Sequence, residues 1–199
     1  MEVQVHTVAD HDTRDKIFRS AARLFADRGY NGVSVREISE LSGVSKPMIY
    51  YYFGSKEGIY SELLKTGRDF ASENLQAILA CDLPLRDKLV ELFKARFAMC
   101  HRHPEYVRFY LSALLSSDDL PFTKMMTSDI LHPQTLLKQM IQNGINSGEM
   151  SCRINANIVA AMIAGVQFVY IWQNLNLNEP VLDDHLAEEI VNHLLHGMI

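Results

Sequence analysis

The stretch Ser34–Phe53, with the sequence SVREISELSGVSKPMIYYYF, contains two short helix signals separated by a glycine turn. Ser34 and Glu37 form an S-x-x-E capping box, a pattern in which each residue satisfies a free backbone or side-chain group of the other at a helix start. Ser45 stands where the N-cap of a second short helix is expected. Gly43 lies between the two segments and supplies a tight turn. The stretch therefore predicts a helix-turn-helix unit.

Three consecutive tyrosines, residues 50–52, lie in the second of these helices. Ile49 and Phe53 are four residues apart and form a narrow inward face. Successive residues of an α-helix turn by about 100°, so a helix this short cannot bury three tyrosines in a row. We expect Tyr52 to pack inward or at the rim, because aromatic side chains are usually buried. The other two phenols should then face outward.

Helical periodicity continues on both sides of this unit, and no strand-like alternation flanked by hairpin turns is present. Glycines and prolines fall between long apolar stripes and mark the helix ends. The fold class expected is therefore all-α, with a three-helix N-terminal head that contains the helix-turn-helix, followed by a larger helical domain. The predicted helices are 13–28, 35–41, 45–53, 55–79, 85–102, 105–116, 122–146 (bent or broken near Pro133), 154–175 and 182–197.

The charge of the chain is uneven. The 199 residues have a formal net charge of −5, yet residues 13–60 hold eight Lys/Arg against five Asp/Glu. A basic segment on an acidic chain favours one end that meets a polyanion. Three scattered cysteines suit a reducing compartment better than a disulfide framework. The N-terminal segment is polar and acidic, which is not typical of a signal peptide. We therefore expect a cytoplasmic protein that is not bound to a membrane.

Residues 13–60 resemble the DNA-binding domain of the tetracycline-repressor (TetR) family. The motifs that carry the resemblance occur in order and at the family's spacing: AARLFADRGY, SVREIS, GVSKPMIYYYF and SKEGIY. They cover about a quarter of the chain. The resemblance implies two domains, residues 1–56 for the N-terminal tail and DNA binding, and residues 57–199 for effector binding and dimerisation.

The resemblance also implies which residues contact DNA. Side chains at the start of the first short helix would approach the duplex, and those at the start of the second would enter the major groove. Tyr50 and Lys56 would bind phosphates, and Tyr51 would touch the backbone or a base. Met48 departs from the family pattern, in which Ser or Thr is frequent; an apolar contact with a thymine methyl group would replace a hydrogen bond there. Taken alone, Arg36 could equally be a solvated charge paired with Glu40. The candidates are Val35, Arg36, Ser45, Lys46, Pro47, Met48, Tyr50, Tyr51 and Lys56.

The resemblance implies a homodimer and an effector site in the remaining sequence, and the sequence offers some support for dimerisation, although the apolar stripe of the last helix could also merely cap its own domain. Residues 157–175 are apolar almost all round, with small residues that let helices approach closely. The last helix has an apolar stripe, so two helices from each subunit could form a four-helix bundle. Apolar and aromatic residues in the long helices are candidates for an effector pocket, although such residues are more often plain core. The candidates are Phe97, His101, Phe109, Tyr110, Met125, Met140, Phe168 and Trp172.

No nucleophile elbow, phosphate loop or H-E-x-x-H motif occurs, and the histidines lack metal-ligand spacing. We therefore expect no catalytic site, no metal and no cofactor. The function predicted is a transcriptional regulator, most simply a repressor, that binds a palindromic double-stranded operator as a dimer and is released by a small apolar or aromatic effector. Two alternatives remain: a constitutive DNA binder without effector, and a helical protein-interaction module.

Overall fold

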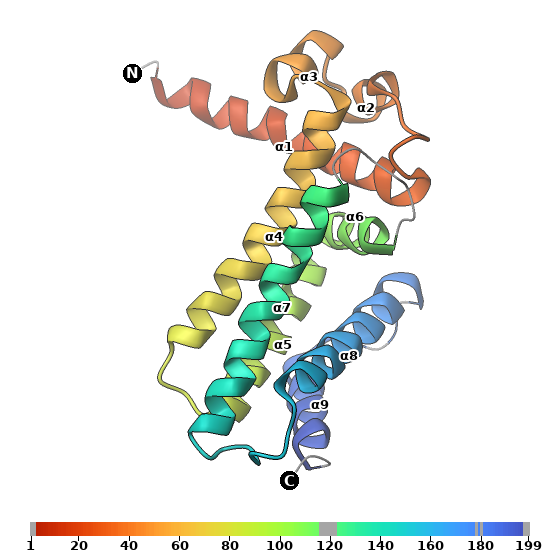
Figure 1. The fold of residues 1–199 in the computed structure, drawn as a ribbon. Coiled ribbons are helices and arrows are strands. Elements are labelled where there is room, and N and C mark those ends of the chain that lie inside the picture. The colour runs from red at the N-terminus through yellow and green to blue at the C-terminus, as the bar shows by residue number, and fades with distance from the viewer. Residues whose placement is uncertain (1–2, 116–122, 178, 180, 197–199) are drawn as a thin grey trace. The chain divides into compact units, whose positions relative to one another are not determined.

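The computed structural model describes the backbone of residues 3–115, 123–177, 179 and 181–196, and the side chains of residues 11–115, 133–177, 179 and 181–195. Within these residues the chain is entirely helical, as the sequence predicts, and has nine α-helices and no strand (Figure 1). The helices are α1 (Val3–Arg28), α2 (Val35–Ser42), α3 (Lys46–Phe53), α4 (Lys56–Ala80), α5 (Leu85–Arg102), α6 (Pro104–Leu115), α7 (Thr123–Asn146), α8 (Ala156–Leu177) and α9 (Asp184–His196).

Two helices differ from the prediction. The first begins at Val3 and not near Thr13, because a helical backbone does not need the apolar stripe from which the prediction was made. The seventh continues through Pro133 without a break. A proline inside a helix removes one backbone hydrogen bond but leaves the neighbouring turns intact, so a long helix can tolerate it at a cost in stability.

The chain divides into two compact units, residues 1–67 with 105–122, and residues 68–104 with 123–199. We call them the head unit and the body unit. Helix α4 begins in the head unit and ends in the body unit, whereas α6 belongs to the head unit although it follows α5 in sequence. The functional boundary predicted between residues 56 and 57 stays a prediction.

The interior of the head unit is built on aromatic side chains. Phe25 is 1% exposed, and its ring lies 5.1 Å from that of Tyr60 and 6.2 Å from that of Phe109. The rings of Tyr60 and Phe109 are 5.0 Å apart and nearly perpendicular. Edge-to-face pairs of this kind stabilise beyond the area they bury. This cluster joins α1, α4 and α6 into one core.

The body unit is formed by α5, α7, α8 and α9 with the end of α4. Helix α8 packs against α7 and α5, and α5 also packs against α9. Two polar contacts join distant segments: the Leu85 N–H donates to the Glu149 carboxylate over 2.6 Å, and His101 Nε2 lies 2.8 Å from the Leu182 carbonyl oxygen. The first contact satisfies an N–H at the start of α5, which otherwise lacks an intrahelical partner.

Candidate nucleic-acid interface

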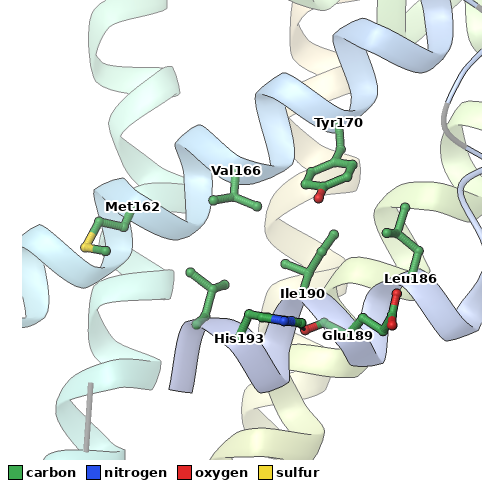
Figure 2. Close-up of a pocket in the computed structure, with 8 residues that line it drawn as sticks. Met162, Val166, Tyr170, Leu186, Glu189, Ile190 and His193 are labelled. Atoms are coloured by element: carbon green, nitrogen blue, oxygen red, sulfur yellow. Dashed lines mark hydrogen bonds between the residues drawn. The ribbon is translucent and has the colours of Figure 1, made fainter. Parts of the chain in front are cut away.

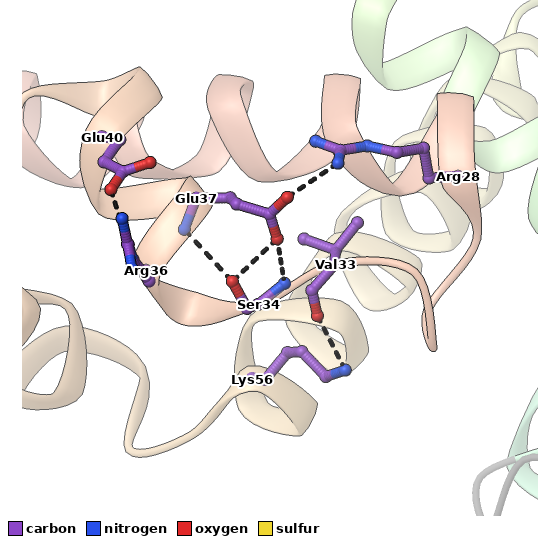
Figure 3. Close-up of polar contacts among 7 residues, drawn as sticks. All are labelled: Arg28, Val33, Ser34, Arg36, Glu37, Glu40 and Lys56. Carbon is purple, nitrogen blue, oxygen red and sulfur yellow. Dashed lines mark hydrogen bonds and ion pairs between the residues drawn. The ribbon is translucent and has the colours of Figure 1, made fainter.

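The start of α2 has the capping box that the sequence predicts (Figure 3). The Glu37 N–H donates to Ser34 Oγ, and the Glu37 carboxylate accepts from the Ser34 backbone N–H over 2.8 Å. The same carboxylate accepts from Arg28 at the end of α1, over 2.7 Å. Gly43 ends α2 in the left-handed conformation, with φ at 68°, which a residue with a side chain rarely adopts. These local contacts fix how α2 enters and leaves the helix-turn-helix.

The hydrogen bonds at this cap predict a pH dependence of stability. Donation from the Ser34 hydroxyl and backbone, and then from Arg28, lowers the pKa of Glu37 from 4.5 to about 2. Because the folded-state pKa lies below the unfolded value, the contribution of the carboxylate is present above pH 4.5 and is lost as the pH falls toward 2. We expect the melting temperatures of the wild type and of Glu37→Gln to converge as the pH falls through that range. A difference between their melting temperatures that is constant from pH 6 to pH 2 would contradict this role.

Lys56, the first residue of α4, binds the loop between α1 and α2 (Figure 3). Its ammonium donates to the carbonyl oxygens of Tyr30 and Val33, both over 2.9 Å, and lies 4.0 Å from the centre of the Tyr30 ring. Burial lowers the pKa of Lys56. The sequence did not predict this contact, which ties the first turn of α4 to the residues just before α2. The phosphate contact predicted for Lys56 stays a prediction.

The inward face of α3 lies against α1. Ile49 is 1% exposed, and the Phe53 ring stacks on Phe18 at 5.8 Å with 7° between the planes. The guanidinium of Arg14 lies 5.3 Å from the centre of the Phe53 ring and is held by Glu62 over 2.7 Å. Stacked rings and a cation over an aromatic face both favour one fixed orientation. The predicted inward pair therefore sets which side of α3 faces outward.

The outward face of α3 is rich in phenol and aliphatic carbon. Tyr51 is 77% exposed, Tyr50 is 49% exposed and Met48 is 39% exposed. Lys46 and Pro47 are also exposed. Tyr52 is half-buried at the rim, with its ring 5.3 Å from that of Tyr51. The predicted exposure of two phenols is confirmed, and the five exposed side chains of α3 form one candidate surface for a ligand.

The serines at the helix starts differ in what their hydroxyls do. Ser55 accepts from the Gly58 N–H over 3.0 Å and caps α4. Ser45 occupies the N-cap position of α3 but makes no side-chain capping bond, so its predicted capping role is corrected. An N-cap oxygen accepts from the second or third N–H of the helix. Pro47 stands second and has no N–H, which removes one of the two donors and leaves the Ser45 hydroxyl exposed for another partner.

At the start of α2, Val35 is half-buried and Arg36 is exposed. The Arg36 Nε donates to the Glu40 carboxylate over 2.8 Å, one turn further along the helix (Figure 3). The intrahelical pair considered from the sequence is therefore present. The remaining guanidinium N–H groups can still reach a phosphate, so the predicted contact of Arg36 with DNA stays a prediction.

The structure distributes the predicted effector residues over both units. Phe109 and Tyr110 belong to the head unit, where Phe109 is 1% exposed in the aromatic core. Phe97 and Met140 are core residues of the body unit, each 2% exposed, and Trp172 is 44% exposed. Phe168 is half-buried, and His101 contacts the backbone of Leu182 as described. The side chain of Met125 lies outside the described residues. The core positions of Phe97, Phe109 and Met140 give these residues a packing role, and an effector role stays a prediction.

A groove of about 400 Å³ lies between α8 and α9 (Figure 2). Side chains of α8 line one side and those of α9 the other; the polar groups of the lining are the Tyr170 hydroxyl of α8 and the Glu189 and His193 side chains of α9. None of the predicted effector residues whose side chains the structure describes lines it. The sequence did indicate where this groove lies, because its lining comes from the apolar stripes of the last two helices. The lining residues are Met162, Val166, Tyr170, Leu186, Glu189, Ile190, His193 and Leu194.

Comparison with known proteins agrees with the geometry of the head unit. Residues 17–63 match the sequence model of the bacterial regulatory proteins of the tetR family. This range begins in α1, contains α2 and α3 and ends in α4. It therefore covers the second part of α1, the helix-turn-helix and the lysine at the start of α4.

Similarity extends along most of the chain in individual relatives. The HTH-type transcriptional repressor NicS of Pseudomonas putida is 30% identical over 184 residues, which cover 90% of this chain and 83% of NicS. The repressor KstR2 of Mycolicibacterium smegmatis is 28% identical and covers 79% of this chain and 77% of its own length. The regulator FadR of Bacillus subtilis, solved in complex with stearoyl-CoA, shares the fold with a TM-score of 0.77 at 21% identity, covering 94% of this chain and all of the FadR chain. With its helix-turn-helix head and wholly helical described body, the protein belongs to the TetR family of bacterial transcriptional regulators.

Proposed function

We propose that this protein is an effector-responsive transcriptional repressor that binds a palindromic operator as a homodimer. The observation that carries the proposal is the outward face of α3, on which Tyr50 and Tyr51 are 49% and 77% exposed beside Lys46. Phenol rings exposed to water do not stabilise the fold. In contact with DNA, the phenol hydroxyls can donate to phosphate oxygens and the rings can cover the sugars. Residues 1–56 then serve DNA binding, and residues 57–199 serve effector binding and dimerisation.

The predicted DNA contacts divide by chemistry. Lys46 and the phenols supply charge and hydrogen bonds to phosphates, and the exposed hydroxyl of Ser45 adds a further donor at the start of α3. Pro47 and Met48 offer only carbon and sulfur to the base edges. Val35, Arg36 and Lys56 lie at the starts of α2 and α4, where helix N-termini also present backbone N–H groups to phosphates.

Exposed apolar side chains of α8 support the homodimer. Met162, Val169 and Trp172 of α8 are 46%, 48% and 44% exposed, which is unusual for large apolar side chains in a protein that remains a monomer. A second copy, related by twofold symmetry, presents the same apolar surface and would bury both. Two heads placed about 34 Å apart by the dimer would read two half-sites of a palindrome.

Helix α8 has a second property that this proposal explains. Among the described helices it alone is long and apolar enough to cross a membrane by length and composition, and 33% of its most apolar window is buried in the chain. Burial of the remaining apolar surface against a second copy would be consistent with that composition, and we propose that the protein acts in the cytoplasm.

The interior of the body unit supports an effector site. Within the described residues, the Gln167 carboxamide nitrogen and the Ser72 hydroxyl are buried without a hydrogen-bond partner, each side chain being in a residue 8% exposed. Such groups cost about 1–3 kcal/mol when left unsatisfied, and a polar group of a bound ligand would satisfy them. The other buried side chains among the described residues of the body unit are apolar, so we propose an effector with a large apolar part.

Helix α4 gives the effector a route to the DNA, because it begins at Lys56 in the head unit and its last residues belong to the body unit. A ligand that displaces the end of α4 would change the separation of the two heads and prevent both from fitting successive grooves. A ligand that binds the displaced state about 10²-fold more tightly than the other state shifts the equilibrium between the two states by roughly 2.7 kcal/mol.

Loss of operator binding in head-unit variants tests the proposal. We expect Lys46→Ala and Tyr50→Ala to weaken binding to a duplex selected from a random library by about tenfold each, and Lys46→Ala to reduce the salt dependence of log K by about one unit. Fluorescence anisotropy at several salt concentrations measures both, and Lys65→Ala, an exposed lysine of α4, is the matched control. Equal affinities of wild type and variants, with unchanged circular dichroism, would refute the assigned face.

Stearoyl-CoA is the first effector probe, since the FadR structure contains it, and coenzyme A without the acyl chain is its control. We expect stearoyl-CoA to lower operator affinity about a hundredfold, in line with usual coupling energies, and coenzyme A to leave it unchanged. Equal effects of the two compounds would contradict an effector recognised through its apolar part.

A further inference from the structure

The outward face of α3 is unusual for a helix that reads bases, because its exposed side chains carry very little hydrogen-bonding capacity for base edges. In the major groove, arginine or lysine reads guanine, asparagine or glutamine reads adenine, and aspartate or glutamate reads cytosine. The eight residues of α3, KPMIYYYF, contain one lysine and none of the other five. Direct reading by hydrogen bonds is therefore limited to Lys46, the phenol hydroxyls and the hydroxyl of Ser45 at the N-cap.

The position of the apolar side chains on α3 decides what else the helix can read. The N-terminal residues of a recognition helix contact the base edges, and Met48 is the third residue of α3. It is 39% exposed, whereas its neighbour Ile49 is 1% exposed. Pro47 is also exposed and precedes it. The first turn of α3 thus presents two adjacent apolar side chains and one ammonium.

Thymine is the base that offers an apolar group in the major groove of unmodified DNA, through its 5-methyl group. The side chains at the start of α2 do not compensate, since Arg36 is held by Glu40 over 2.8 Å and Val35 is half-buried. We propose that Met48 determines operator specificity by packing on a thymine 5-methyl group, with Pro47 beside it. This inference rests on the proposed DNA-binding function and assigns the chemistry by which it selects a sequence.

The flexible thioether of methionine suits this contact, because Met fills irregular apolar surfaces with little directional preference. Removing the thymine methyl group would expose the Met48 side chain to water without breaking any hydrogen bond. Since one buried methyl or methylene group accounts for about a fourfold change in affinity, uracil in place of the contacted thymine should weaken binding about fourfold per half-site. Uracil at this position in both half-sites of a palindrome should then weaken binding about sixteenfold.

A uracil scan on the full-length protein tests the proposal. Duplexes are first selected from a random library, and each thymine of the selected sequence is then replaced singly by deoxyuridine, which lacks only the methyl group. Anisotropy titrations are made with the wild type, with Met48→Ala and with Met48→Leu. We expect one thymine position per half-site to show the fourfold loss with the wild type and with Met48→Leu, and less than about twofold with Met48→Ala.

The outcomes separate this inference from the function on which it rests. Failure to enrich any duplex from the library would refute DNA binding itself. Enrichment of a duplex that binds equally well with uracil at every position would leave the function standing and overturn the methyl contact. A loss of affinity on uracil substitution that is equally large in Met48→Ala would mean that the loss arises from the shape of the DNA. It would also overturn the proposal. Because Met48 is exposed in the free protein, neither substitution removes a core side chain.

Discussion

If the protein is the proposed dimer, Met162→Glu is expected to convert it into a monomer and to lower operator affinity by about 10²–10⁴-fold, the factor that linked binding sites usually provide. Met162 lines the groove between α8 and α9 and is 46% exposed in the single chain. A carboxylate there would have to lose its water when a second copy covers the groove, and a buried unpaired charge is strongly unfavourable. The monomer itself keeps its fold, because the new side chain remains in solvent.

Analytical ultracentrifugation measures the state of association, and anisotropy with the selected duplex measures affinity. Leu83→Glu is the matched control, since Leu83 is 40% exposed between α4 and α5 and is not part of the groove. It introduces the same charge at a similar exposure and should leave both readouts unchanged. A Met162→Glu protein that sediments as the wild type does would show that the α8–α9 groove is not the dimer interface.

Phe18→Ala is expected to lower the free energy of unfolding of the head unit by about 3–5 kcal/mol, the usual cost of truncating a buried phenylalanine. Phe18 is 6% exposed, stacks on Phe53 of α3 and makes an edge contact with Tyr106 of α6 at 5.5 Å. Its loss leaves a cavity beneath the recognition helix. Operator binding should weaken together with stability, because α3 then has several orientations in place of one.

Urea unfolding followed by circular dichroism gives the overall midpoint. The two units need not unfold together, and the sole tryptophan, Trp172, reports on the body unit. Hydrogen exchange of the α3 amides therefore measures the head unit directly. Phe18→Leu is the control, because it keeps most of the apolar volume and should cost under about 1.5 kcal/mol. Unchanged exchange rates in Phe18→Ala would contradict the role of this ring as the support of α3.

Local signals determined most of the fold. The capping box at Ser34 and Glu37, the turn at Gly43 and the serine cap before α4 all act between residues a few positions apart, so the sequence predicts them from short-range geometry. The same reasoning places Tyr50 and Tyr51 on the outside, since consecutive helical residues cannot share one buried face. The predicted cap by Ser45 was wrong, because the prediction did not consider that Pro47, two residues later, has no N–H to donate.

Packing between distant segments decided the rest. Lys56 contacts carbonyl oxygens 23 and 26 positions earlier, and periodicity contains no signal for such a contact. Phe109 and Phe97 have the same character in the sequence, yet one lies in the head unit and the other in the body unit. Periodicity shows which face of a helix is apolar but not what covers it. Only the folded chain shows which apolar side chains fill a core and which, like Met162 of α8, stay exposed.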